Sequence, residues 1–222
     1  MASIVTYKYI KQNPDIMEYI KRADQSLKAQ GYTEHSFAHV EIVAQNASMI
    51  LETLGYDERT VELARIAGIM HDIGNVINRI DHAQSGAVMA FRLLDNLSMP
   101  ASEICSIISA IGNHDESTAT PVDPISAALI IADKADVRRS RVRNNDFTKF
   151  DIHDRVNYAV EQSSLYFNEE KTAIILDIKI DIGISNLIEY FEIFLDRMLL
   201  CKRACSFLGV DFQMIANGSP IM

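Results

Sequence analysis

Six candidate metal-binding side chains lie between residues 39 and 133: His39, His71, Asp72, His82, His114 and Asp133. Imidazole and carboxylate groups together suit Fe, Mn, Zn, Co or Ni better than Ca. The His-Asp dipeptide alone is weak evidence, because the chain has three such pairs and one pair more often marks a helix terminus than a metal site. The positions of the six residues on the expected helices are more informative.

Apolar periodicity and capping signals predict helices at about 14–29, 36–55, 58–74, 82–97, 102–114 and 124–139. The candidate ligands fall at the ends of these helices, except for Asp133, which interrupts the apolar last one. Because consecutive helices joined by short loops pack antiparallel, their ends share one level of a bundle. A buried Asp133 would be costly unless it were paired or bound to metal. We therefore expect one polar pocket, sufficient for two metal ions that share a carboxylate.

The turn between the third and fourth expected helices brings two candidate ligand groups together. We interpret Gly74 as the glycine that ends the third helix. Asp81 is expected to cap the start of the fourth. This connection would place His71 and Asp72 beside His82.

The pattern changes after residue 143. A polar connector and a short amphipathic helix at 151–162 precede a β-hairpin, whose strands are expected at 164–167 and at 172–181, where apolar and polar residues alternate. A long helix at about 185–208 and a loose tail follow. The expected fold is mostly α: a helical bundle with an appended β-hairpin and a long C-terminal helix. We divide it into an N-terminal helix (1–31), a metal-binding helical core (32–143) and a C-terminal part that packs on the core (144–222).

Composition narrows the class of protein. The sequence has 48% hydrophobic residues and no uncharged apolar run of 18 residues, so a membrane span is not expected. No secretory signal is visible, and the three cysteines form no CxxC pair, which is typical of reduced thiols in a cytoplasmic protein. The net charge of −9 argues against a long nucleic acid as the partner.

Basic residues nevertheless cluster at 134–143, in the sequence KADVRRSRVR. Such a patch on an acidic protein suits a small phosphorylated ligand. It could equally be a solvated helix end, because cations favour helix C-termini. The residues alone leave both interpretations open.

The order of the six candidate ligands resembles the HD-domain superfamily of metal-dependent phosphohydrolases. The strings that carry the resemblance lie within residues 32–143: YTEHSFAHVEIVAQNA, GIMHDIGN, DHAQSGAVMA, AIGNHDE and LIIADKADVRR. The additional histidines, His82 and His114, resemble the two-metal branch, which includes HD-GYP-type cyclic dinucleotide phosphodiesterases and bacterial diadenosine tetraphosphate hydrolases. The glycine-rich GYP signature is absent after NHDE, which disfavours the first of these activities.

The resemblance implies a role for each matching residue. His39, His71, Asp72 and Asp133 would hold one divalent transition-metal ion, and Asp72, the catalytic residue, would bridge to a second ion held by His82 and His114. The substrate would be a small, nucleotide-like phosphoester or phosphoanhydride. Its phosphates would contact four basic residues, Lys134, Arg138, Arg139 and Arg141.

The chain departs from the family pattern at Asn75, where many relatives have lysine, so an acid is missing there. We interpret His35 and His153 as solvent-exposed, although His35 could also support a ligand or face the substrate. Asp115 and Glu116 are interpreted as part of a solvated loop, with orientation of His114 or contact with substrate as the alternative. Two other functions stay open: a di-iron oxygenase on the same bundle, and a non-catalytic metal-stabilised signalling module. A homodimer is also possible.

Overall fold

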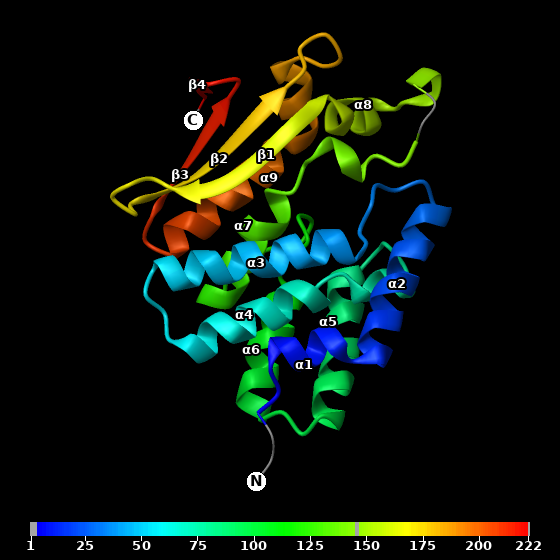
Figure 1. Cartoon of the computed structure of the whole chain (residues 1–222), viewed down its shortest axis with the longest axis vertical. Coiled ribbons are helices and arrows are strands. Elements are labelled where there is room, and N and C mark those ends of the chain that lie inside the picture. Colours follow the sequence, from blue (N-terminus) through cyan, green and yellow to red (C-terminus); the bar gives the residue numbers. More distant parts are fainter. Residues whose placement is uncertain (1–3, 145–146, 222) are drawn as a thin grey trace.

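The computed structural model describes residues 4–144 and 147–221. Its N-terminal two thirds consist of helices (Figure 1). These are α1 (Tyr7–Gln12), α2 (Pro14–Ala29), α3 (Phe37–Thr53), α4 (Glu58–Met70), α5 (His82–Asn96), α6 (Ala101–Gly112) and α7 (Pro124–Lys134), with a short 3₁₀ turn, η1 (Ile73–Val76), between α4 and α5. The mostly α fold expected from the sequence is confirmed.

Three helices form the centre of this bundle. α3 packs against both α4 and α7, and α4 also contacts α7. The approach of α3 to α4 is close because Gly68 lies against the Ala44 backbone, where an added Cβ would come within 2.6 Å of Ala44 Cα. α7 is mostly apolar and buried, with Leu129 and Ile131 fully enclosed.

The C-terminal part combines α8 (Ile152–Ala159) and α9 (Leu187–Phe207) with a four-stranded sheet of order β1-β2-β3-β4. β1 (Val160–Phe167) and β2 (Ala173–Ile180) form the expected antiparallel hairpin. β3 (Asp211–Ala216) pairs in parallel with β2, so α9 is the crossover helix between them, and β4 (Ser219–Pro220) completes the sheet. In Figure 1 the sheet lies above the bundle, with α9 between them.

The structure corrects several predicted boundaries. The loose tail predicted after residue 208 instead contains β3, because Phe212, Met214 and Ala216 alternate with more exposed residues and bury one face of the strand. The helix predicted to reach 139 ends at Lys134, and the helix predicted at 151–162 ends at Ala159, where β1 begins.

The turn before α5 also differs from the prediction. Asp81 has a left-handed backbone (φ 56°) and makes no capping hydrogen bond. Gly74 lies inside η1 and does not end α4; its missing side chain matters because an added Cβ would come within 2.0 Å of the His82 carbonyl. Glycine is thus required at position 74 because η1 packs closely against the start of α5.

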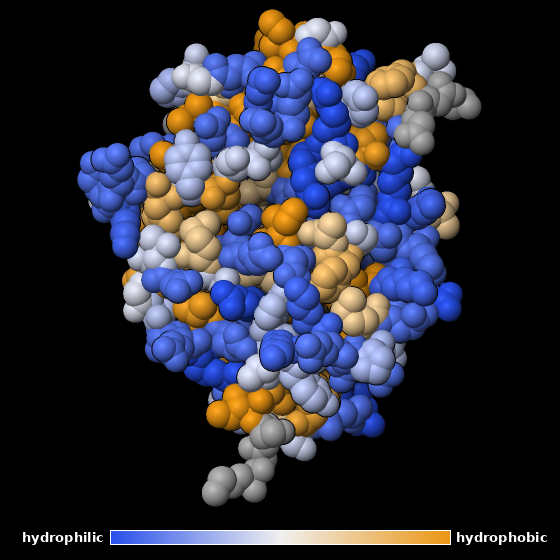
Figure 2. Space-filling model, viewed as in Figure 1, coloured by the Kyte–Doolittle hydropathy of each residue, from blue (hydrophilic) through white to orange (hydrophobic). Residues whose placement is uncertain are grey.

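The surface fits a chain of this composition. Figure 2 shows polar side chains over most of one face, with apolar residues scattered among them, as is usual for globular proteins. Among the described residues, no helix is long and apolar enough to cross a membrane. The cytoplasmic location, the homodimer and the three-part division of the chain stay predictions.

Candidate metal centre

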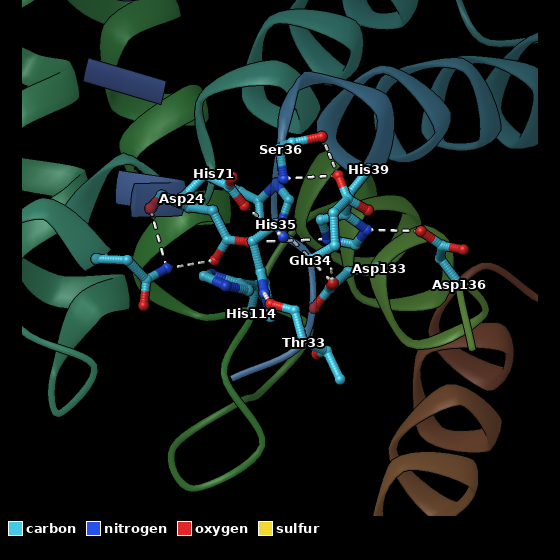
Figure 3. A network of polar contacts seen from close by, with 12 residues as sticks. Asp24, Thr33, Glu34, His35, Ser36, His39, His71, His114, Asp133 and Asp136 are labelled. Atoms are coloured by element: carbon cyan, nitrogen blue, oxygen red, sulfur yellow. Dashed lines mark hydrogen bonds and ion pairs between the residues drawn. The ribbon is translucent and has the colours of Figure 1, made fainter. Parts of the chain in front are cut away.

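Three elements bring one group of predicted ligands together. His39 comes from the first turn of α3, His71 and Asp72 from the end of α4, and Asp133 from the last turn of α7. His39 Nε2 lies 3.3 Å from Asp133 Oδ1 and 3.7 Å from Asp72 Oδ2, and His71 Nε2 lies 3.2 Å from Asp72 Oδ2. Figure 3 shows His39, His71, His114 and Asp133 turned toward one another. We call His39, His71 and Asp133 the inner group.

The other predicted ligands lie beside the second oxygen of Asp72. His82, the first residue of α5, places its Nε2 3.6 Å from Asp72 Oδ1. His114, just after α6, places its Nε2 3.2 Å from His82 Nε2. We call His82 and His114 the outer group. The two oxygens of Asp72 therefore face different histidines, Oδ2 the inner group and Oδ1 the outer group.

Each of these four histidines has its other ring nitrogen occupied. Nδ1 lies 2.7 Å from Gly68 O in His71, 3.0 Å from Arg79 O in His82 and 2.6 Å from Ile111 O in His114. In His39 it lies 2.7 Å from Asp136 Oδ2. Carbonyl and carboxylate oxygens only accept hydrogen bonds, so each Nδ1 carries a proton and each Nε2 faces the centre. Metal-binding histidines are oriented in this way.

Three atoms at the centre lack a hydrogen-bond partner among the residues that the structure describes. These are His39 Nε2, His71 Nε2 and Asp72 Oδ2, which are buried, although buried polar atoms almost always have a hydrogen-bond partner. Three sets of ligand atoms lie within 4.8 Å of one another: His39, His71 and Asp72; His71, His114 and Asp133; and Asp72, His82 and His114. The donor set, mixed nitrogen and oxygen, thus fits divalent transition-metal ions.

Comparison with known protein families shows which family the helical core belongs to. A family model described as the HD domain matches residues 36–139. Residues 36–139 form an HD domain. The resemblance to the HD-domain superfamily seen in the sequence is thereby confirmed, and all six candidate ligands lie within this range.

Two individual proteins are also similar to this chain. An uncharacterized protein of Methanocaldococcus jannaschii is 24% identical over 211 residues, which covers 84% of this chain and 79% of that protein. A crystal structure of a predicted HD superfamily hydrolase from an uncultured Thermotogales bacterium is 24% identical, with a TM-score of 0.42, and covers 59% of this chain and 73% of that one.

Electrostatics within the HD domain favour a cation at the centre. Burial disfavours charge on His71, but the Asp72 and Asp133 carboxylates outweigh burial and raise the His71 pKa to about 10. Burial also opposes ionisation of Asp133, yet Lys134 and the nearby histidines hold its pKa well below the usual range. Burial, with the positive charges of His71 and Lys134, lowers the pKa of His114 to about 3. The carboxylates stay ionised, and a metal ion bound at His71 would displace its proton.

Asn75 has a different role from the lysine of many relatives. Its side-chain amide is buried and donates to Asp72 Oδ1 at 2.8 Å and to Asp72 O at 3.0 Å. It therefore orients the carboxylate that lies between the two groups of histidines. Arg79, one turn later, places its Nη1 3.4 Å from Asn75 Oδ1 and 3.3 Å from His82 Nε2. A cation thus reaches the outer group from a residue that sequence reasoning did not single out.

A cavity of about 390 Å³ opens onto the centre. Its lining includes Asp72, His82, His114 and Asp133 of the HD domain, together with residues from the α2–α3 loop, α8 and α9. His153 of α8 is exposed, as expected, but it lies in this lining. His35, expected in solvent, also lines the cavity and is half-buried; burial and the charge of Arg141 hold its pKa well below the usual range.

The four basic residues expected to contact substrate lie in different places. Lys134 and Arg141 line the cavity, whereas Arg138 and Arg139 line a separate surface depression beside β1. Arg138 pairs with Asp136, and Arg139 donates to the Tyr158 carbonyl at 2.5 Å. Neither arginine is in the lining of the cavity, and Arg138 lies behind His39, on the far side of Asp136.

Lys134 and Arg141 line the cavity, but their charged groups already contact oxygens of the protein. Lys134 Nζ contacts Asp133 Oδ2 at 2.6 Å and is 3.4 Å from Glu116 Oε1. Arg141 donates to the carbonyls of Glu34 and Asp136. Both side chains are buried, and both charged groups are paired with oxygens of the protein.

Proposed function

We propose that this chain is a metal-dependent phosphohydrolase that uses two divalent transition-metal ions to hydrolyse a phosphoester or phosphoanhydride of a small, nucleotide-like substrate. The matched HD domain and its buried His/Asp clusters support a metal-dependent hydrolase. The choice of phosphorus as the reacting centre, the two ions and the small substrate are our proposal.

The observation that carries the proposal is the position of Asp72 between two sets of histidine nitrogens. Oδ2 lies 3.2 Å from His71 Nε2, and Oδ1 lies 3.6 Å from His82 Nε2. One carboxylate with each oxygen toward a separate set of nitrogen ligands is the arrangement expected for a bridge between two ions. The Asn75 amide holds that carboxylate in place from one side.

Two bound metal ions would supply Lewis-acid activation of water and of the phosphoryl oxygens. The chain's own residues have distinct tasks around them. Hydrogen bonds at Nδ1 keep the four histidines in the orientation and tautomer that present Nε2. Arg79 provides a guanidinium at the cavity wall beside His82, where it can donate to phosphate oxygens. A cation at Arg79 compensates for the absence of lysine at position 75.

The cavity supports a small substrate. Its volume of about 390 Å³ falls within the range of roughly 300–1,000 Å³ that small-molecule sites occupy. Its lining combines cations such as Arg79 and Arg197 with carboxylates such as Asp151 and Asp154 on α8. A phosphate could therefore face the basic side chains while hydroxyl or amino groups of the same molecule donate to the acidic ones. The net charge of −9 also disfavours a long polyanion.

A metal analysis combined with a substrate panel tests the proposal. We expect about two transition-metal equivalents per chain and release of phosphate from at least one member of a panel. That panel would hold an aryl phosphate, nucleoside mono- and triphosphates and dinucleoside polyphosphates. One equivalent or none would contradict the two-metal site. A metal-loaded chain inactive on the whole panel would contradict phosphoester hydrolysis.

A further inference from the structure

A series of ion pairs connects a metal-ligand candidate to the C-terminal helix. Asp133 Oδ2 contacts Lys134 Nζ at 2.6 Å, and Lys134 Nζ lies 3.4 Å from Glu116 Oε1 in the α6–α7 loop. The same Glu116 oxygen contacts Arg197 Nε, on α9. The charges alternate in sign from the centre outward. We call these four residues the ion-pair series.

Lys134 restricts the way in which Asp133 can bind a metal ion. Asp133 Oδ1 faces the centre, 3.3 Å from His39 Nε2 and 3.6 Å from His71 Nε2. The other oxygen, Oδ2, is occupied by the Lys134 ammonium. A carboxylate whose second oxygen pairs with an ammonium offers a single oxygen to the metal. Lys134 also competes with the metal for the negative charge of Asp133.

Glu116 moderates that competition. Lys134 is only 4% exposed, and a buried charge requires compensation by its neighbours. Glu116 shares the Lys134 charge with Asp133, because its Oε1 is buried and contacts cations on both sides. Removal of the Glu116 charge would leave Lys134 to pair with Asp133 alone, and the metal would then bind less tightly.

Arg197 extends the series to an element outside the HD domain. α9 packs on α7, and its Phe194 is buried with the Arg197 guanidinium 4.7 Å from the ring centroid. Arg197 is therefore held against the protein surface at the Glu116 side chain. It draws negative charge away from Lys134, the opposite effect to that of Glu116.

We infer that α9 sets the metal affinity of the HD domain through Arg197, Glu116 and Lys134, which together make Asp133 a one-oxygen ligand. Arg197 and Glu116 are positioning residues that act through Lys134. The inference rests on the proposed metal-dependent function, but it concerns metal binding alone and can be tested without a substrate.

Calorimetric titration of the metal-depleted full-length chain with Co²⁺ provides the measurement. Glu116→Gln should weaken Co²⁺ binding about tenfold, a typical coupling for charged groups. Arg197→Met should strengthen binding about threefold, since this pair is partly exposed. Lys134→Met should strengthen binding and alter the visible absorption of bound Co²⁺, because Asp133 can then offer both oxygens. Lys202→Met, which removes a cation from an exposed position on α9, is the matched control and should change neither quantity.

A double-mutant cycle separates the ion-pair series from simple electrostatics. If Arg197 acts through Lys134, Arg197→Met should have no effect in a Lys134→Met background, and Glu116→Gln should lose most of its effect there. Equal effects in both backgrounds would overturn the inference. Tight Co²⁺ binding that Arg197→Met leaves unchanged would overturn it as well, while the proposed function would stand. A wild-type chain that binds no Co²⁺ would overturn both.

Discussion

The inner and outer groups of ligands are built differently, although they share Asp72. Charged side chains contact two members of the inner group: Asp136 holds His39, and Lys134 holds the second oxygen of Asp133, which also lines the cavity. Both members of the outer group are oriented by main-chain carbonyls and line the cavity, where Arg79 contacts His82. The inner group therefore has charged partners that can tune affinity for an ion, and both histidines of the outer group face the space that a substrate would occupy.

The largest effect should come from the residue that both groups share. Asp72→Ala removes the carboxylate between them and should lower phosphohydrolase activity by about a thousandfold, as expected when a central electrostatic element is removed. Circular dichroism should show the same helix content, and metal analysis should show loss of both equivalents. Asp95→Ala, on the exposed side of α5, is the control. Retention of activity in Asp72→Ala would place the chemistry elsewhere.

A second variant should disturb the outer group but not the inner group, by shifting the backbone at the start of α5. In Gly74→Ala the new methyl would lie 2.0 Å from His82 O and 2.5 Å from Gly86 N, so the start of α5 must shift. We expect a loss of about 1–3 kcal/mol in the free energy of unfolding and selective loss of the second metal equivalent. Gly112→Ala, whose methyl meets only Ala87 at 3.7 Å, should retain both equivalents. Two equivalents and an unchanged melting temperature in Gly74→Ala would show that the turn can adapt.

The inner group should respond to the loss of one carboxylate behind it. Asp136→Asn removes the negative charge from the partner of His39 Nδ1 and should weaken binding of the first metal equivalent by about 10–100-fold. Binding of the second equivalent should change little. Titration of the metal-depleted chain with Co²⁺ measures both. Glu34→Gln, which alters the other carboxylate near Arg138, should leave the first equivalent unaffected. Equal weakening of both equivalents would remove the distinction between the groups.

The smallest expected effect lies at the cavity. Arg79→Met should raise KM for phosphorylated substrates about tenfold, since one charged hydrogen bond contributes about 1.5 kcal/mol. The Arg79 carbonyl that orients His82 stays in place, so the metal content should be that of the wild type. Steady-state kinetics beside Arg92→Met, an exposed cation on α5, provide the comparison. An unchanged KM would mean that phosphate binds without Arg79.

The sequence was informative about the candidate ligands because each lies in a local motif near a helix end. It could not reveal their surroundings in the same way. His39 and Asp136 are 97 residues apart, and Arg197 reaches the site from a helix outside the HD domain. Such contacts depend on how helices pack, and no spacing rule reports that packing. The position of Lys134 in a basic stretch predicted a contact with phosphate. In the structure its ammonium is buried and paired with Asp133 and Glu116.

The C-terminal sheet shows a similar limit. The alternation of Phe212, Met214 and Ala216 was visible in the sequence, but six residues near a chain end can also be unstructured. Their pairing with β2 depends on α9 returning the chain to the same sheet. The connection is long-range, so the expected hairpin was only half of the sheet.

Three of the four oriented histidines donate to a main-chain carbonyl three residues earlier: His71 to Gly68, His82 to Arg79 and His114 to Ile111. Every amino acid has that carbonyl, so replacing a side chain at these earlier positions leaves the acceptor in place. A substitution at Arg79 therefore leaves the acceptor for His82 in place, whereas at Gly68 any side chain would meet the Ala44 backbone. Among the four histidines, only His39 depends for its orientation on a side chain that a point mutation can remove. The directions of the rings are thus set mainly by the main chain, within the limit that close packing imposes at Gly68.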